Sequence, residues 1–365
     1  SVRYRKMKRL LSLDFFRGLT IAAMIIVNDP GSWSHVYAPL RHAEWNGATP
    51  TDLVFPFFLF IVGVSISLSL SKRKNGGLNL YTKIFKRSVI IFLLGIFLAL
   101  FPKFDFENLR VVGVLQRIAI VYFICALIFL NTNFKSQLKI GVGLLVFYWI
   151  TMMFIPFNGN IAGTLEPGNN LAAWIDSFIV PGRMYQGSWD PEGFYSTIPA
   201  IASGISGMLS GTIILNKANS LKDKIISLFF WGSIILIIGY FWDYIFPINK
   251  HIWTSSYVLY SSGLAMIILA ISTWLIDEKN YTSNIKIGLV FGSNAITAYV
   301  LHGIVWRLFQ IPVINGLGFQ KFWMDTGIGL GLPPKFVSLD WAIFYTFVIY
   351  LLIYQLYKRK IFLKV

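Results

Sequence analysis

Long apolar runs separated by short polar segments form the main pattern of this sequence. A helix needs about 20 mostly apolar residues to cross the roughly 30 Å hydrocarbon core of a bilayer. The runs are continuously apolar and do not alternate, which favours helices over a β-barrel. We therefore expect an all-α polytopic membrane protein with about ten transmembrane helices. The predicted spans cover residues 15–28, 51–71, 87–102, 112–130, 138–155, 194–215, 224–246, 252–276, 286–304 and 340–357.

The composition agrees with this pattern. Of the 365 residues, 56% are hydrophobic and only 13% are charged, whereas about 25% charged residues are usual in soluble domains. A soluble fold of this length has too little interior to hide so much apolar surface. The single cysteine, Cys125, lies in an apolar run without an intrachain partner, so it gives no information on the redox compartment.

The excess of basic residues indicates how the spans are oriented. The chain carries 32 Lys and Arg against 16 Asp and Glu, a formal net charge of +16. With the N-terminus placed inside, 22 basic residues fall in predicted inner segments and eight in outer ones. The positive-inside rule then places both termini in the cytoplasm. Because the basic residues lie between apolar runs and form no single patch, we expect no nucleic-acid partner.

The predicted outer segments are long, while the inner connections are short. Segments 29–50, 156–193 and 305–339 are rich in Gly, Pro, Trp, Asn and Asp, and all four histidines map to the outer half. Some of these aromatic side chains are expected to anchor the protein at the membrane interface. Long polar and aromatic loops on one face are also where a functional site is assembled.

The connection between the first two spans carries the most informative polar residues. A neutral imidazole at His42 is suited to take a proton from an amine or hydroxyl nucleophile, and Asp52 or Glu44 can orient it. Asn28 and Asn46 can donate hydrogen bonds to a developing oxyanion. The alternative is structural, with Asp52 capping the second span and His42 bonding only to a loop. The sequence leaves both interpretations open.

Arg17 lies near the inner start of the first span. It either pairs with Asp14 as a snorkelling arginine or contacts a phosphate that approaches from the cytoplasm. Asp190 and Glu192 precede the span predicted at 194–215, where carboxylates suit the helix dipole, and we expect them to cap that helix. In the same span, residues 203, 207 and 211 are small and spaced by four, which predicts a close helix-packing face.

Four further polar residues fall inside predicted spans. Gln116 and Arg117 occupy the outer part of the fourth span, where they either hold the bundle together or face a polar cavity. Asn294 and His302 are eight residues apart, so a continuous helix places them nearly on one face, about 12 Å apart along its axis. No phosphate-binding glycine loop, serine-hydrolase motif or metal-ligand spacing is present in the sequence.

Several motifs together resemble one known family, and the matches continue along almost the whole chain. The sequence is similar to the membrane domain of the heparan-α-glucosaminide N-acetyltransferase family and its shorter microbial relatives. The motifs are Leu13-Asp-Phe-Phe-Arg-Gly18, Val27-Asn28, Arg41-His-Ala-Glu-Trp-Asn-Gly47, Thr51-Asp-Leu-Val-Phe-Pro-Phe-Phe-Leu-Phe-Ile-Val-Gly63, Gly113-Val-Leu-Gln-Arg117, Asp190-Pro-Glu-Gly193, Asn249-Lys-His-Ile-Trp253, Asn294, His302 and Arg359-Lys-Ile-Phe362.

The resemblance implies a transmembrane acyltransferase that takes acetyl-CoA from the cytoplasm and acetylates the amine of a terminal glucosamine on the far side. In that family the histidine matching His42 is regarded as the active-site residue, and the asparagine matching Asn28 belongs to the same site. The acetyl group either rests on that histidine or passes directly to the sugar. The family also implies a homodimer embedded in the lipid bilayer, with no metal cofactor.

Two departures from the animal enzyme bear on the acceptor. The chain begins almost at the first shared span, so we expect a microbial-type homologue without the N-terminal lumenal domain. After Asn28 the sequence reads Asp-Pro-Gly-Ser-Trp, where the animal enzyme has a glycine-rich run. Because this change borders the predicted sugar side, we expect it to bear on which sugar is accepted and not on the class of reaction.

The resulting hypothesis is a single transmembrane acyltransferase domain over residues 1–365 in a bacterial inner membrane, with acetyl-CoA as co-substrate. The alternatives are an O-acyltransferase of an envelope glycan and a secondary transporter or glycan exporter. A transporter would show paired broken helices and repeated halves. We expect His42, Asn28 and Asp52 to be catalytic, Arg17 to bind acetyl-CoA, and Trp45, Asn46, Gln116, Arg117, Asn294 and His302 to bind substrate.

Overall fold

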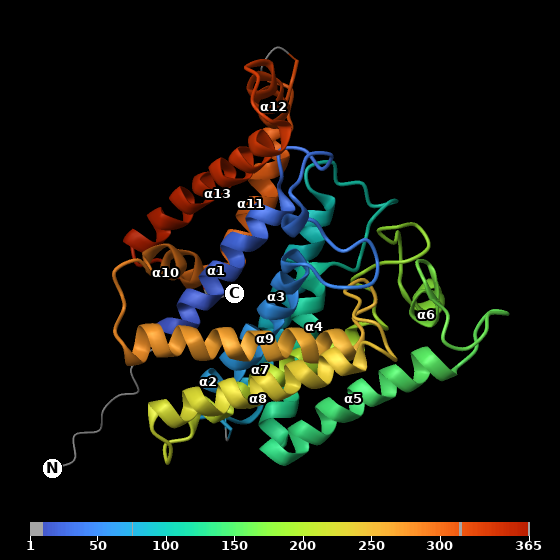
Figure 1. Ribbon diagram of the computed structural model, residues 1–365, viewed down its shortest axis with the longest axis vertical. Coiled ribbons are helices and arrows are strands. Elements are labelled where there is room, and N and C mark those ends of the chain that lie inside the picture. The colour runs from blue at the N-terminus through green and yellow to red at the C-terminus, as the bar shows by residue number, and fades with distance from the viewer. Residues whose placement is uncertain (1–9, 75, 314–315, 364–365) are drawn as a thin grey trace.

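The computed structural model describes residues 10–74, 76–313 and 316–363. These residues form helices and loops, with one antiparallel pair of short strands, β1 (Leu165–Glu166) and β2 (Asn169–Asn170). Apart from this hairpin, the predicted all-α polytopic architecture is confirmed (Figure 1). The α-helices are α1 (Leu11–Asn28), α2 (Val54–Leu70), α3 (Gly77–Leu100), α4 (Val114–Asn131), α5 (Phe134–Phe154), α6 (Leu171–Ile179), α7 (Thr197–Leu215), α8 (Leu221–Trp242), α9 (Ser255–Thr273), α10 (Lys286–Ser293), α11 (Ala295–Phe309), α12 (Phe319–Gly329) and α13 (Pro334–Lys358).

The number of membrane-spanning helices is slightly lower than the expected ten. In the described part of the chain, eight helices are long and apolar enough to cross a membrane, and the bent pair α10 and α11 makes a ninth if it crosses as one span. The remaining predicted span, residues 87–102, falls in α3. Every 18-residue stretch of α3 includes Lys83, Lys86 and Arg87. Because of these three charges, α3 is not among the helices that are apolar enough to cross a membrane.

The small-residue face predicted in α7 packs against α2. A Cβ atom on Gly207 would lie 1.9 Å from the carbonyl oxygen of Phe60, and one on Gly211 would lie 2.0 Å from the Ser67 hydroxyl. Small residues allow two backbones to approach this closely, which is how helices gain packing energy inside a membrane. The predicted packing face is therefore confirmed at Gly207 and Gly211, and it supports α2, the helix that follows the turn carrying Asp52.

The span predicted as continuous over 286–304 is broken. Helices α10 and α11 meet at Asn294 with a bend of 85°, so the expectation that Asn294 and His302 share one helical face was wrong. The physical reason lies in the bonds of Asn294, whose Oδ1 accepts from the Leu363 N–H at 2.8 Å and whose Nδ2 donates to the Ile361 carbonyl at 3.1 Å. The asparagine thus ties the C-terminal segment to the break.

The loops assigned to the outer side come together at one end of the bundle. Gly47 pairs with Asn249 in an isolated bridge, which joins the connection after α1 to the connection after α8. The other end of the bundle has its own contacts, since the Ser12 N–H donates to Asp277 Oδ2 at 3.2 Å. The alternation of the spans therefore sorts the loops into two groups, and the polar connection that follows α1 lies in the group predicted to be outer.

Candidate active site

A cavity of about 590 Å³ opens where α1, α2, α4 and α11 meet the outer loops. Of the α1 residues that line it, Thr20 is the one nearest the start of the helix and Asn28 is the last. These two residues are eight apart, so the cavity extends about 12 Å along α1. Its polar and charged lining residues are Thr20, Asn28, His42, Thr51, Arg110, Tyr185, Gln186, Glu192, Lys250, His251 and Tyr299.

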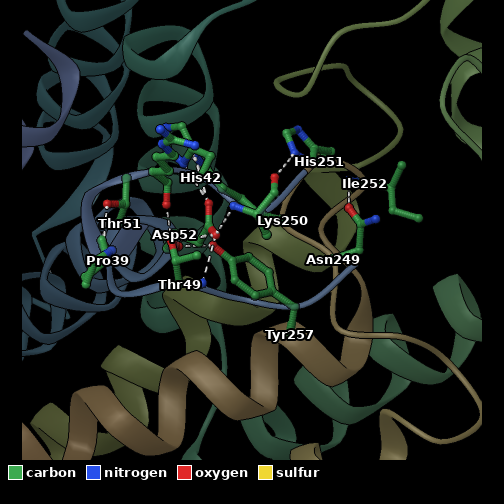
Figure 2. Close-up of polar contacts among 12 residues, drawn as sticks. Pro39, His42, Thr49, Thr51, Asp52, Asn249, Lys250, His251, Ile252 and Tyr257 are labelled. Carbon is green, nitrogen blue, oxygen red and sulfur yellow. Dashed lines mark hydrogen bonds and ion pairs between the residues drawn. The ribbon is translucent and has the colours of Figure 1, made fainter. Parts of the chain in front are cut away.

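His42 and Asp52 form a polar pair at this cavity, with His42 in its lining and Asp52 buried behind it (Figure 2). Asp52 lies in a 3₁₀ turn, Pro50–Leu53, immediately before α2. Its Oδ2 accepts backbone N–H bonds from Thr49 and Ala43, both at 2.9 Å, and its Oδ1 lies 2.7 Å from His42 Nδ1. The two sequence interpretations of Asp52 therefore hold together, because one carboxylate oxygen caps the turn while the other orients the imidazole.

The Asp52 contact determines which nitrogen of His42 carries the proton. Asp52 is the nearest partner of Nδ1 and its carboxylate can only accept a hydrogen bond, so we assign the proton to Nδ1 and the lone pair to Nε2. On this assignment the charged Lys250, whose Nζ is 3.1 Å from Nδ1, does not donate to it. The side chain of His42 is 31% exposed, whereas that of Asp52 is completely buried. This arrangement gives a base with fixed orientation at the cavity surface, held by a carboxylate that water does not reach.

Lys250 stands beside this pair. Its Nζ lies 3.1 Å from His42 Nδ1 and 3.9 Å from Asp52 Oδ1 (Figure 2). Burial lowers the pKa of Lys250, and the negative charges of Glu192 and Asp52 oppose that shift. When it is charged, the ammonium disfavours a second proton on the imidazole. From the sequence, Lys250 was expected only to be an outer basic residue, although it belongs to the motif Asn249-Lys-His-Ile-Trp253.

Trp45 holds the loops together behind the cavity. Its ring stacks on His251 with centroids 5.3 Å apart and 8° between the planes, and its Nε1 donates to the Leu165 carbonyl at 2.8 Å. His251 Nε2 lies 3.1 Å from the Ala43 carbonyl, to which it donates. Burial lowers the pKa of His251, so a neutral ring is favoured. His251 lines the cavity and Trp45 does not, so a direct role of Trp45 in substrate binding stays a prediction.

Asn46 is likewise engaged within the protein. Its Oδ1 accepts from Asn249 Nδ2 at 3.2 Å, next to the bridge at Gly47, whose φ of 97° suits glycine. Asn28, in contrast, lines the cavity together with His42. Of the two asparagines proposed as oxyanion donors, Asn28 is therefore the one that the fold places at the cavity.

An ion cluster forms another part of the cavity wall. Arg110 binds Asp190 through two bonds of 2.7 and 2.6 Å, and it also pairs with Glu192. Although burial opposes the charge, these two carboxylates raise the pKa of Arg110. The expectation that Asp190 and Glu192 cap the following helix was wrong, because α7 begins only at Thr197 and both carboxylates turn to Arg110. No local pattern in the sequence predicts this cluster, since Arg110 lies 80 residues from Asp190.

Gln116 and Arg117 lie inside the bundle and outside the cavity lining. Arg117 Nη2 donates to the Gly193 carbonyl at 2.8 Å, and the guanidinium stands over the Trp253 ring at 5.1 Å. The Gln116 side chain packs against Gly95, where a Cβ atom would lie 2.3 Å from its Oε1. These contacts match the bundle-holding alternative for both residues, and their role in substrate binding stays a prediction.

His302 and Arg17 are also placed outside the cavity lining. His302 Nδ1 bonds to the Tyr299 carbonyl, and its Nε2 lies 3.8 Å from Asp29 Oδ2. Arg17 pairs with Asp14 at 3.1 Å, so the snorkelling pair is present. Arg17 lies three residues before Thr20, about 4.5 Å along the axis of α1 from the cavity wall. The contact of Arg17 with a phosphate stays a prediction, and so does the role of His302 in substrate binding. Asn294 lies at the break between α10 and α11, and its role in substrate binding also stays a prediction.

Comparisons with known proteins point to one family. The sequence profile described as "Heparan-alpha-glucosaminide N-acetyltransferase, catalytic" matches residues 9–175. The human protein named heparan-alpha-glucosaminide N-acetyltransferase is 29% identical over 364 residues, which cover 82% of this chain and 54% of the human protein. The mouse protein of the same name is 27% identical over 420 residues, covering 98% of this chain and 60% of the mouse protein. The chain thus spans little more than half the length of these relatives.

Proposed function

Because this chain is a relative of the heparan-alpha-glucosaminide N-acetyltransferases, we propose that it is a transmembrane acetyltransferase. It moves an acetyl group from cytoplasmic acetyl-CoA to the amine of a glucosamine-type sugar on the opposite side of the membrane. The observation that carries this proposal is the His42 imidazole, held by a buried Asp52 at 2.7 Å in the wall of a cavity at the outer end of the bundle.

The chemistry follows from the tautomer of His42. In direct transfer, Nε2 takes a proton from the acceptor amine while the amine nitrogen attacks the acetyl carbonyl carbon, and the carbon–sulfur bond to CoA breaks. In the two-step route, Nε2 itself attacks the carbonyl, CoA leaves as the thiolate, and the amine then takes the acetyl group from the imidazole. Asn28 lines the same cavity and donates to the oxyanion in either route.

The donor enters from the end of the bundle that carries most of the basic residues. Arg17 is proposed to contact the phosphates of acetyl-CoA. The pantetheine arm then extends toward the cavity, whose wall begins about 4.5 Å farther along α1. Only the acetyl group needs to reach the outer side. The same charge distribution supports cytoplasmic termini in a bacterial inner membrane, and a homodimer is proposed from the family resemblance alone.

The charges around the cavity favour an amino sugar over a neutral alcohol. Arg110 and Lys250 in the lining carry two positive charges. Glu192 in the lining, together with the buried Asp52 and Asp190 that pair with lining residues from behind, carries three negative charges. The lining and the carboxylates behind it therefore sum to one excess negative charge, which attracts an ammonium group and offers nothing comparable to a hydroxyl. On these grounds N-acetylation is preferred to O-acylation of an envelope glycan, the alternative acyltransferase reaction.

The broken α10–α11 span is the one observation that favours a transporter. Transporters of this kind place broken helices in corresponding positions of two halves. Within the described residues, one such bent pair is found and it has no counterpart. A polar cavity that lies at the outer end, with a histidine–carboxylate pair in its wall, supports catalysis more directly.

The test is an assay of purified protein with acetyl-labelled acetyl-CoA and glucosamine. His42→Ala should lower kcat by about 10² to 10⁴-fold, the usual contribution of a general base. His35→Ala is the matched control, since His35 also lies in the connection after α1 but outside this cavity. A folded His42→Ala protein with wild-type turnover would exclude the catalytic assignment. Glucosamine flux into liposomes without acetylation would instead establish a transporter.

A further inference from the structure

A second and larger hollow, which shares no lining residue with the His42 cavity, lies between α5 and α8. Helix α5 packs on α7 and α8 packs on α9, and a groove of about 880 Å³ remains between the two pairs. We call it the α5–α8 groove, and Figure 1 shows these four helices together in the lower part of the molecule. Its apolar walls include Leu138, Val142, Leu145, Ile234, Ile235 and Ile238.

We propose that the α5–α8 groove binds one anionic glycerophospholipid whose headgroup carries a hydroxyl donor. The acyl chains lie along the apolar walls and the phosphate lies beside Lys74. This inference is independent of the acetyltransferase function, because none of its residues lines the His42 cavity.

The length of the groove matches one leaflet of a bilayer. Its lining runs along α5 from Phe134 to Leu145 and along α8 from Ser227 to Ile238. Both stretches advance by eleven residues, which corresponds to about 16 Å of helix. Half of the roughly 30 Å hydrocarbon core is about 15 Å. Acyl chains of one leaflet therefore fit along the groove.

The polar end of the groove has a single charge. Lys74 is the one charged side chain among the described residues that line it. Its Nζ donates to the Thr132 carbonyl at 3.2 Å and stands 4.8 Å from the centre of the Phe129 ring, so the ammonium is positioned at the groove. Asn216 and Asn219 lie at the same end. A cation without a neighbouring acid in the lining suits a phosphate.

Gln137 supplies a second and independent sign of a ligand. It lines the groove and is only 2% exposed, yet no described residue donates a hydrogen bond to its Oε1. Its Nε2 is engaged with the Thr132 carbonyl at 3.4 Å. A buried acceptor without a donor is unfavourable and calls for a partner. A headgroup hydroxyl next to the phosphate would supply that donor.

The hydroxyl groups deeper in the groove do not require a polar ligand. Ser206 Oγ bonds to Ser262 Oγ at 2.9 Å, and Ser210 Oγ donates to the Ser206 carbonyl at 2.8 Å. The unsatisfied polar groups are thus confined to one end, and the remaining length is effectively apolar. This distribution is that of an amphipathic molecule with a single polar head.

The distribution of polar groups argues against a helix from a second copy of the chain. Lys74 and Gln137 Oε1, to which no described residue donates, lie at one end and the walls are apolar along the rest, which matches an amphipathic lipid. Acyl chains are thinner than a helix and conform to the irregular walls.

Native mass spectrometry and thermal unfolding of delipidated protein test the proposal. Phosphatidylglycerol is added in one arm, phosphatidylcholine with the same acyl chains in another, and inorganic phosphate in a third. The wild type should retain one phosphatidylglycerol at least fivefold better than phosphatidylcholine, and its Tm should rise. Equal retention of the two lipids, or an equal rise in Tm with inorganic phosphate, would overturn the proposal.

Three variants and one control variant separate the contributions. Lys74→Met should abolish the preference for phosphatidylglycerol, while Lys135→Met, an exposed lysine of α5 outside the groove lining, should retain it. Gln137→Leu should raise the Tm of the delipidated protein and reduce the further rise on adding lipid, which a purely structural glutamine would not do. Val142→Trp fills the groove and should block retention. If Val142→Trp instead dissociates a dimer without loss of lipid, the occupant is a second copy.

Discussion

Among the described residues, two histidine–aspartate pairs lie in the part of the chain predicted to be outer, and they differ in distance and in exposure. In the first, His42 Nδ1 lies 2.7 Å from Asp52 and the ring is 31% exposed in the wall of a cavity. In the second, His302 Nε2 lies 3.8 Å from Asp29 and its side chain is only 9% exposed. The same two residue types therefore provide a base in one place and a buried contact in the other.

Access and tautomer together decide the role of each histidine. His42 donates a hydrogen bond from Nδ1 to a buried carboxylate, which leaves the lone pair of Nε2 available at the cavity. His302 uses Nδ1 for the Tyr299 carbonyl of its own helix, and it stands behind the cavity wall that Tyr299 forms. Four substitutions in and around these pairs test this contrast, and those with the strongest consequences come first.

Asp52→Asn should have the largest effect on activity. The amide can donate to Nδ1, which favours the wrong tautomer and leaves Nε2 protonated. The same change in the aspartate of a serine protease triad costs about 10⁴ in kcat, and here we expect a loss of at least about 10²-fold. Asp29→Asn is the matched control beside His302 and should change kcat by less than about threefold. Equal losses in the two variants would erase the distinction between the pairs.

Glu192→Gln should weaken acceptor binding by about tenfold, the size of one charge-assisted hydrogen bond or ion pair. The substitution removes the one carboxylate among the described residues of the cavity lining, so KM for glucosamine should rise while KM for acetyl-CoA stays constant. Glu166→Gln provides the control, since this outer-loop acid lies outside the cavity lining. An unchanged KM for glucosamine in the Glu192 variant would remove the argument for an amine acceptor.

Lys250→Met should flatten the dependence of stability on pH. Because burial lowers the pKa of Lys250 in the folded protein, the unfolded chain binds this proton more readily. Wild-type stability therefore rises with pH between the lowered pKa and the ordinary value of about 10.4. The variant should lack this rise. The Tm at pH 10 minus the Tm at pH 8 should therefore be a few degrees lower in the variant than in the wild type. Lys335→Met, in the outer part of the chain, should follow the wild type, and a parallel curve for Lys250→Met would contradict the burial argument.

His302→Leu should have the smallest effect on turnover, within about threefold of the wild type. Loss of one buried contact typically lowers stability by about 0.5 to 3 kcal/mol, which thermal unfolding will record. The informative quantity is kcat of the folded fraction. A collapse of kcat comparable with that of Asp52→Asn, in a protein with an intact unfolding transition, would place His302 in the catalytic site after all.

Much of the fold was predictable because a membrane span is a local property of the sequence. Each apolar run must form its backbone hydrogen bonds within itself, so length and hydropathy suffice to locate it. The small residues at 203, 207 and 211 likewise identified a packing face. The break at Asn294 was not predictable in this way, because its side chain bonds to Ile361 and Leu363, nearly seventy residues along the chain.

The sequence alone determined the membrane architecture and the resemblance to one family. It also indicated the connection predicted to be outer, which carries or adjoins His42, Asn28 and Asp52. Which of these groups meet became clear only in the folded chain. There Lys250 lies beside His42 and Arg110 beside Glu192, while Gln116, Arg117 and His302 stand behind the cavity. Burial and ion pairing depend on distances between segments far apart in sequence, whereas hydropathy and helix periodicity depend only on neighbours.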